Sequence, residues 1–335
     1  MKQYVIGVDG GNTKTDYFLY DIEGNFIDAI RSGSCSHEAL KDSFDGSFRV
    51  MKEELNKLLS RNNLTPKDIV ASAYGLAGVD VPYQKKALDE IVAKIGFQNF
   101  IVANDGFLGI KAGTVSGIGA CSINGTGTVS VGIDDLGHYM QVGGIGVVSG
   151  DEAGGAFLAR RVIQAAYNQT YRFGEATSLT QAVYELLDIK DKYDFSNQVS
   201  LKFAAGKVDR TTLIKLLFQH ANHGDKVAIN ILEEAGEAMA RSTSGCISEL
   251  VIDGVIEVVL AGSVWAKATA NHMCESFKYW VTKLTKRECS FHILDAPPAI
   301  GAIIWAIELA TQKHPSLEVK ANILKSIEHY QNQYL

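Results

Sequence analysis

The sequence VDGGNTKTDYFLYD, residues 8–21, joins an apolar run to an alternating one through a glycine-rich turn. In a dinucleotide-binding unit a helix follows the glycines, whereas Gly10 and Gly11 here open a second strand. The chain also lacks a GxxxxGK sequence followed by Ser or Thr, so neither a Rossmann fingerprint nor a P-loop applies. The stretch predicts a β-hairpin, which the turn IEGN and the segment FIDAIRS extend to three antiparallel strands.

The same pattern returns in GACSINGTGTVSVGIDDLGHYMQVGG, residues 119–144, where Asn124 stands 115 residues after Asp9. Two later strand patterns, VIEVVLAGSVW and SFHILDAPPAIGA, repeat ASAYGLAGVD and NFIVANDGFLGIK of the first half. We therefore expect one β-β-β-α-β-α-β unit used twice, in lobes of residues 1–115 and 116–335. A helical insertion over about residues 151–250 is expected in the second lobe, and packing of the last helix back on the first lobe is left open.

Composition limits the partners that we expect. The chain has 335 residues, a formal net charge of −6 and no run rich in Lys and Arg, which argues against a nucleic-acid or membrane partner. It begins without the apolar core of a signal peptide and holds no apolar stretch of about 18 residues. Its 5 cysteines are scattered without a CxxC pair. These features predict a cytoplasmic protein with reduced thiols that acts on a small molecule.

The two glycine turns are candidate phosphate sites. A glycine-rich hairpin turn leaves successive backbone N–H groups unpaired, and these can form a concave site for phosphate oxygens. Two such turns that face each other would clamp a polyphosphate. The alternative is that glycine only supplies a positive φ in tight hairpins. Because the turns occupy equivalent points of a repeat, we favour a polyphosphate site made by Gly10, Gly11, Asn12 and Thr13 of the first and Gly125, Thr126 and Gly127 of the second.

Six short motifs together resemble a known family: GVDGGNTKTD, GLAGVD, VANDG, INGTGT, GGIGVVSGDEAGGAFLARR and LAGSVW. They are similar to the N-acetylglucosamine kinases and to the related ATPase branch that includes the 2-hydroxyacyl-CoA dehydratase activators. Both groups belong to the superfamily of actin, sugar kinases and heat-shock chaperones. The resemblance runs from residue 5 to about 304. It implies an α/β fold of duplicated RNase H-like, actin-like ATPase domains, with ATP, Mg²⁺ and a sugar bound in the cleft between the lobes. The same resemblance implies that ATP is bound by the residues of both glycine turns and by Lys14.

Two aspartates are candidates for the chemistry of phosphoryl transfer. Asp9 ends the first strand, and a carboxylate beside phosphates is repelled unless a cation lies between them, so we expect Asp9 to hold Mg²⁺. Asp105 ends the strand NFIVAND and is expected to accept the proton of the sugar hydroxyl. The alternatives are a turn aspartate that bonds its own backbone for Asp9 and a helix N-cap for Asp105.

The resemblance also implies sugar and adenosine contacts. Asp151 matches an aspartate that contacts sugar hydroxyls, although helix capping by Asp151 and Glu152 remains an alternative. The sugar contacts implied are Ser36, His37, Gly78, Asp105, Gly143, Gly144, Ile145 and Asp151, with Asp80 as a further option. The adenosine contacts implied are Ala221, Gly262 and Ser263, with Gly224 beside them. All the glycines named could instead serve packing.

The chain departs from the pattern of the animal N-acetylglucosamine kinases on the acyl-amino side of the sugar. Ile145 stands in place of an aromatic residue, and SCSH replaces a turn that carries asparagine. We therefore expect a kinase for the 6-hydroxyl of N-acetylglucosamine, N-acetylmuramic acid or glucosamine. The alternatives are an activator ATPase that binds an iron-sulfur cluster and a sensor of ATP and sugar without turnover. A homodimer is an open option.

Overall fold

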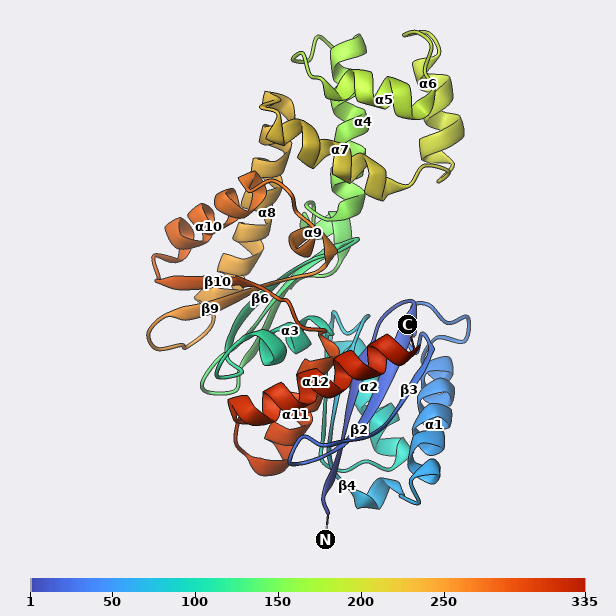
Figure 1. Ribbon diagram of the computed structural model, residues 1–335, viewed down its shortest axis with the longest axis vertical. Coiled ribbons are helices and arrows are strands. Elements are labelled where there is room, and N and C mark those ends of the chain that lie inside the picture. Colours follow the sequence, from blue (N-terminus) through green and yellow to red (C-terminus); the bar gives the residue numbers. More distant parts are fainter. Residues whose placement is uncertain (1, 335) are drawn as a thin grey trace.

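The computed structural model describes residues 2–334 and has two lobes, each built on a five-stranded sheet (Figure 1). The strands of the first sheet lie in the order β3-β2-β1-β4-β5. Their bounds are β1 Tyr4–Gly10, β2 Lys14–Asp21, β3 Phe26–Gly33, β4 Ile69–Leu76 and β5 Phe100–Ala103. Strands β1, β2 and β3 are antiparallel, whereas β4 and β5 join the sheet in parallel. The expected three-stranded meander is therefore confirmed.

The second sheet repeats this topology. Its order, β10-β9-β6-β7-β8, is the order of the first sheet with each strand replaced by its counterpart. The strands are β6 Gly119–Asn124, β7 Thr128–Ile133, β8 Tyr139–Gly143, β9 Ile256–Ala261 and β10 Cys289–Ile293. Here too the first three are antiparallel, and β9 and β10 are parallel to β6. The shared order confirms the predicted duplication.

Helices cover both faces of the first sheet, because successive side chains of a strand point to opposite faces. On β1, Ile6 and Val8 pack with α1 and α2, whereas Val5 packs with α11 and α12. All three side chains are fully buried. The helices of this lobe are α1 Ser43–Arg61, α2 Pro82–Ile95, α3 Gly106–Gly113, α11 Ala299–Thr311 and α12 Leu317–Tyr334, with a short 3₁₀ turn at Pro66–Asp68.

The second lobe carries the expected helical insertion between β8 and β9. Four of its helices form the end of the molecule farthest from the first sheet, and α8 runs from them back to the second sheet (Figure 1). The helices are α4 Gly155–Tyr171, α5 Leu179–Leu187, α6 Phe195–Gln198, α7 Arg210–Asn222 and α8 Lys226–Ser248, with a π-helical turn at Val199–Ala204. After β9 follow α9 Ser263–Ala266 and α10 His272–Thr285.

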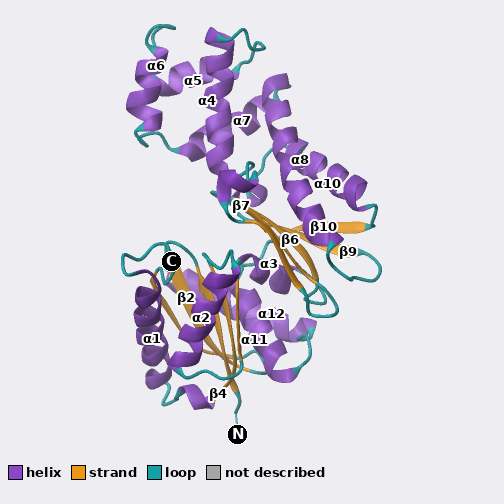
Figure 2. Ribbon diagram, turned by 180° about the vertical axis from the view of Figure 1, so that it is seen from behind, coloured by secondary structure: helices purple, strands orange, loops and turns teal. Residues whose placement is uncertain are grey.

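The last two helices return to the first lobe, as the views from both sides show (Figures 1 and 2). Ile323 and Ile327 of α12 are fully buried against strands of the first sheet, and the Tyr20 hydroxyl of β2 bonds Ser326 at 2.7 Å. We therefore propose that the lobes divide at residue 115 and that α11 and α12, at the end of the second lobe's sequence, pack on the sheet of the first lobe. Among residues 2–334, none of the helices combines the length and hydropathy that a membrane span needs.

A buried ion pair fixes α11 beside α3, the helix that precedes the crossing between lobes. The Lys111 side chain of α3 is 3% exposed, and its Nζ lies 2.8 Å from Glu308 Oε1. Burial lowers the Lys111 pKa, and the Glu308 charge opposes that shift. Glu308 has a second partner, because its Oε2 lies 3.0 Å from His314 Nδ1.

This asymmetry predicts unequal costs of removing the two partners. Glu308→Leu leaves a buried cation without its carboxylate, and we expect the free energy of unfolding to fall by about 3 kcal/mol or more. Lys111→Met should cost less, because Glu308 is partly exposed and keeps His314. Urea denaturation of both variants tests this, and an equal or reversed order would contradict it.

Candidate active site

Each of the two glycine turns is closed by one backbone hydrogen bond. In the first, the Gly11 N–H donates to Lys14 O at 2.9 Å, and in the second the Gly125 N–H donates to Gly127 O at 3.0 Å. Within the described residues, the N–H groups of Asn12 and Thr13 and those of Thr126 and Gly127 have no hydrogen-bond partner. Each turn thus offers two successive free donors, as an anion site requires.

The conformational explanation of the turn glycines is not supported. None of Gly10, Gly11, Gly125 and Gly127 has a positive φ. A Cβ on Gly125 or Gly127 would meet no atom within 4 Å, so packing within the chain does not require glycine there either. Close approach of a bound molecule is the remaining physical reason for glycine at these two positions.

Gly262, a predicted adenosine contact, differs from Gly125 and Gly127 because the chain itself requires glycine there. Its φ is +103°, and a Cβ there would lie 2.4 Å from Asn124 O, so both conformation and packing require glycine. We expect Gly125→Ala to leave the melting temperature unchanged and to weaken ATP binding about tenfold. Gly262→Ala should lower the free energy of unfolding by about 1–3 kcal/mol.

Calorimetric titration with ATP and thermal melts of both variants check this pair. Unchanged ATP affinity in Gly125→Ala would remove the second turn from the nucleotide site. A fully stable Gly262→Ala would show that the close contact of β9 with Asn124 is not needed for folding.

The second turn rests on the N-terminus of α4. The Gly155 N–H donates to Gly125 O at 2.8 Å, and the Ala156 N–H donates to Thr126 O at 3.3 Å. A Cβ on Gly154 would lie 2.5 Å from Thr126 O, so glycine permits this contact. The partial positive charge at the start of a 17-residue helix therefore lies beside the free donors of the turn, where it favours an anion.

Asp9 and Asp105 lie close enough for their charges to interact across the end of the first sheet. Burial, followed by the charges of Asp105 and Asp16, raises the Asp9 pKa to about 7. Burial, followed by the charge of Asp80, raises the Asp105 pKa to about 6. Carboxyl groups poised near neutrality at the end of a strand are typical of a catalytic site.

Neither aspartate makes the hydrogen bonds of its structural alternative within the described residues. The Asp9 carboxylate bonds no described residue, so Asp9 does not serve its own turn. Asp105 precedes α3 and its side chain makes no capping hydrogen bond, although the Gly106 N–H lies near enough to lower the Asp105 pKa. Asn104 makes the capping hydrogen bond instead, because its Oδ1 accepts from the Gly106 N–H at 2.8 Å.

Lys14, a predicted ATP contact, is half-exposed, and its Nζ lies 3.5 Å from Asp16 Oδ2. Asp16 faces Asp9 directly across β1 and β2 and is held by Arg31 through Nε–Oδ1 at 2.5 Å and Nη2–Oδ2 at 2.7 Å. Sequence reasoning missed Asp16 and Arg31. The alternation of TDYFLYD places Asp9 and Asp16 together only once the hairpin register is known.

The residues around Asp9 fit a magnesium ion held partly by phosphate. Within the described residues, no group of three or more His, Cys, Asp or Glu side chains is arranged to hold a metal ion. Mg²⁺ in phosphoryl-transfer sites uses one or two carboxylates together with phosphate oxygens and water. Burial and the charges of Asp105 and Asp16 raise the Asp9 pKa more than Lys14 and Arg31 lower it, and a bound metal would favour the ionised form further.

On the predicted sugar side, Asp151 organises its own loop. Its Oδ2 accepts from the N–H groups of Gly144 and Gly146 at 2.9 and 2.8 Å and from Ser149 Oγ at 2.6 Å. Gly143 has φ +83°, and a Cβ there would lie 2.4 Å from Asp151 Oδ1. Asp151 lies four residues before α4 and caps no turn of it. Ile145 is exposed on this loop.

Ser36 and His37 lie on the first lobe and are buried. The His37 ring stacks on Phe44 at 4.2 Å, and its Nε2 lies 3.3 Å from Gln84 Nε2. Gly78, with φ +83°, leaves room for this ring, since a Cβ would lie 2.8 Å from His37 Cε1. Burial lowers the His37 pKa, so the ring is neutral near pH 7. These contacts make His37 part of the loop packing.

The predicted adenosine contacts lie on helices of the second lobe. Ala221 is buried in the core at the end of α7, so only its backbone is available to a ligand. Gly224 follows, with φ +82° and open space around it. The Asn222 amide donates to Thr269 O at 2.9 Å, which joins this junction to the segment after α9, the helix that begins at Ser263.

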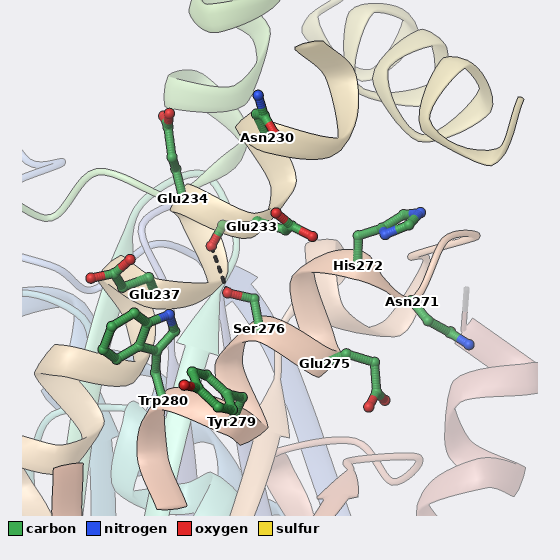
Figure 3. Close-up of a pocket in the computed structure, with 10 residues that line it drawn as sticks. All are labelled: Asn230, Glu233, Glu234, Glu237, Asn271, His272, Glu275, Ser276, Tyr279 and Trp280. Carbon is green, nitrogen blue, oxygen red and sulfur yellow. Dashed lines mark hydrogen bonds between the residues drawn. The ribbon is translucent and has the colours of Figure 1, made fainter. Parts of the chain in front are cut away.

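A groove of about 710 Å³ between α8 and α10 lies away from these residues (Figure 3). It is lined by Glu233, Glu234, Glu237 and Glu275 together with aromatic residues, but three of these glutamates are paired with Arg161, Arg241 and Lys278. It contains none of the predicted site residues.

The duplicated sheets and the paired turns define a two-lobed ATPase of the actin and sugar-kinase fold. The chain belongs to the BadF/BadG/BcrA/BcrD ATPase family, and the match to the family's sequence model covers residues 6–306. This confirms the resemblance stated above.

Two curated relatives and one solved structure illustrate the similarity. The N-acetylmuramic acid/N-acetylglucosamine kinase of Clostridium acetobutylicum is 24% identical, over 91% of this chain and 98% of the relative. The N-acetyl-D-glucosamine kinase of Dictyostelium discoideum is 25% identical, over 75% and 82%. A ROK family glucokinase from Streptomyces griseus, solved with glucose and AMPPNP, has a TM-score of 0.54 at 16% identity, over 92% and 99% of the two chains. This last likeness concerns the fold.

Proposed function

We propose that the protein is an ATP-dependent amino-sugar kinase. It phosphorylates the 6-hydroxyl of N-acetylglucosamine or of a close relative, N-acetylmuramic acid or glucosamine. The observation that carries the proposal is the pair of carboxyl groups at Asp9 and Asp105 beside a glycine turn, close enough that the Asp105 charge raises the Asp9 pKa. The names of the curated relatives support the same substrate class.

In this reaction Asp105 accepts the proton of the 6-hydroxyl as the oxygen attacks the γ-phosphorus of ATP and ADP leaves. The free N–H groups of the two turns bind phosphate oxygens, and the N-terminus of α4 adds to their positive potential. When Mg²⁺ is bound, it neutralises charge on the phosphates, and Asp9 would hold it. Asp151 keeps the Gly143–Gly144 backbone in place beside the sugar.

The iron-sulfur alternative finds no support in three of the five cysteines, whereas Cys274 and Cys289 are partly exposed. Cys121 is fully buried, and Gly109 packs on its Sγ, since a Cβ at Gly109 would lie 2.6 Å away. Cys35 and Cys246 are buried as well. Buried thiols of this kind behave as small apolar side chains, so none of the three is available at a surface shared between subunits.

The test is ADP release with Mg-ATP and each of glucosamine, N-acetylglucosamine, N-acetylmuramic acid and glucose. We expect release with at least one amino sugar and a 6-phosphorylated product. Release with none of them would defeat the proposal and favour the sensor. Release in the absence of sugar by a coloured protein would favour the activator ATPase.

We further propose that the enzyme acts in the cytoplasm, with no nucleic acid or membrane partner. The net charge of −6 and the lack of a basic run support this. The homodimer stays a prediction, which light scattering of the purified protein would test.

A further inference from the structure

Asp80, in the loop after β4, connects the two lobes. Its Oδ1 accepts two hydrogen bonds, one from Asn104 Nδ2 at 3.0 Å and one from Gln141 Nε2 at 2.9 Å. Asn104 follows β5 of the first sheet, whereas Gln141 belongs to β8 of the second. The first lobe holds Asp80 in place, because its backbone N–H donates to Gln84 Oε1 at 2.9 Å and Gln84 lies in α2.

The Asn104 end of this connection reaches the proposed base. Asn104 directly precedes Asp105, and its two amide atoms have different partners. Nδ2 donates to Asp80, and Oδ1 accepts from the Gly106 N–H at the start of α3. The backbone on both sides of Asp105 is therefore fixed by the same side chain, which is 4% exposed as a residue.

The Gln141 end reaches the sugar loop. Gln141 precedes Gly143 by two residues on the same strand. Gly144 packs directly against the connection: a Cβ there would lie 2.6 Å from Asp80 Oδ1 and 2.9 Å from Gln141 Nε2. A shift of the Gly143–Gly144 backbone would therefore displace the side chains of Asp80 and Gln141.

The connection also borders open space. Asp80, Asn104 and Gln141 line a groove of about 650 Å³ between the lobes, together with Phe107 and Tyr139. If the side chain at position 141 has no donor, water in this groove can still reach Asp80. Substitution of Gln141 is therefore not expected to leave the Asp80 charge buried and unpaired.

We propose that Gln141 is a positioning residue, which acts through Asp80 and Asn104 to hold the sugar loop of the second lobe in register with Asp105 of the first. The inference rests on the proposed kinase function and goes beyond it, since Gln141 touches neither reactant in that mechanism. A misplacement of about 1 Å between reacting groups can cost roughly 100-fold in rate.

The experiment is the steady-state kinetics of Gln141→Leu with Mg-ATP and the amino sugar that the wild type phosphorylates best. We expect kcat to fall roughly 10- to 100-fold while the KM for ATP stays within twofold. Gln141→Asn keeps an amide donor and should recover part of kcat. Gln141→Glu, which places a carboxylate against Asp80, should be slower than Gln141→Leu.

Gln181→Leu is the matched control. Gln181 lies on α5, and its amide donates to exposed Glu185, far in the sequence from any proposed site residue. Its kcat should equal that of the wild type. Melting temperatures ensure that each assay is run on folded protein. If Gln141→Leu does not fold, Gln141→Glu takes its place, and a kcat of Gln141→Glu within twofold of the wild type would then overturn the inference.

A kcat of Gln141→Leu within twofold of the wild type would overturn the inference, as would Gln141→Asn no faster than Gln141→Leu. Either result leaves the kinase proposal intact. A wild type that phosphorylates no amino sugar defeats the proposed function itself, so the two failures are distinguishable.

Discussion

Asp105→Asn is expected to lower kcat for sugar phosphorylation by about 10² to 10⁴, the range of general acid–base catalysis. An amide has the shape of the carboxyl group but cannot accept the hydroxyl proton. The KM for ATP should stay near the wild-type value, because the proposed mechanism places Asp105 against the sugar hydroxyl and assigns phosphate binding to the glycine turns. Asp253→Asn serves as the control and should be fully active, because Asp253 is exposed and has no hydrogen bond or ion pair within the described part of the chain.

The pH profile gives the same prediction an independent measure. Asp105 must be ionised to act, and burial raises its pKa to about 6. Activity of the wild type should therefore fall as the pH drops below about 6. A profile that stays flat down to pH 5 would contradict the assignment of Asp105 as the base, and near-normal turnover of Asp105→Asn would remove that residue from the mechanism.

Asp9→Asn is expected to lower turnover by roughly 10² to 10³ and to raise the Mg²⁺ concentration required for half-maximal activity. The loss arises because a neutral amide is a poorer ligand for a hard cation than a carboxylate. Titration of initial rates with Mg²⁺ at fixed ATP measures it. A rate loss with an unchanged Mg²⁺ requirement would mean that Asp9 acts by some route other than the metal.

The same substitution should stabilise the unliganded protein at high pH. Asp9 has a pKa near 3.8 when unfolded and about 7 when folded. Between these values the folded protein binds a proton that the unfolded chain does not, so the free energy of unfolding falls as the pH rises through this window. In buffer without Mg²⁺ or nucleotide, Asp9→Asn should therefore melt above the wild type at pH 8, and the gap should shrink toward pH 4. A constant gap would contradict the burial of the Asp9 charge.

Much of the fold could be predicted from the sequence, because its signals are local. Strand alternation, turn glycines and their recurrence after 115 residues define the two meanders and their order. The candidate carboxylates could be found too, since Asp9 lies at the end of β1 and Asp105 follows β5 by two residues, both in segments of recognisable pattern.

Other parts of the site depend on contacts between distant residues. The role of Asn104 as the cap of α3, in place of Asp105, follows from one side-chain rotamer. The pairing of Asp16 with Arg31 requires the register of β2 and β3. The resemblance gave Asp80 only as an optional sugar contact, whereas the structure shows that it accepts hydrogen bonds from Asn104 of the first lobe and Gln141 of the second.

The sequence by itself determined a repeated unit, two glycine turns and two aspartates after strand patterns. Each of these features depends on hydrophobic periodicity or turn residues within a short stretch of sequence. Only the tertiary structure decided that α11 and α12 complete the first lobe and that Gln141 reaches Asp80 across 61 residues of chain. It also decided that Gly125 is free of packing while Gly262 is not. The physical reason is that burial, pKa shifts and close approach depend on neighbours brought together by folding, which no local pattern records.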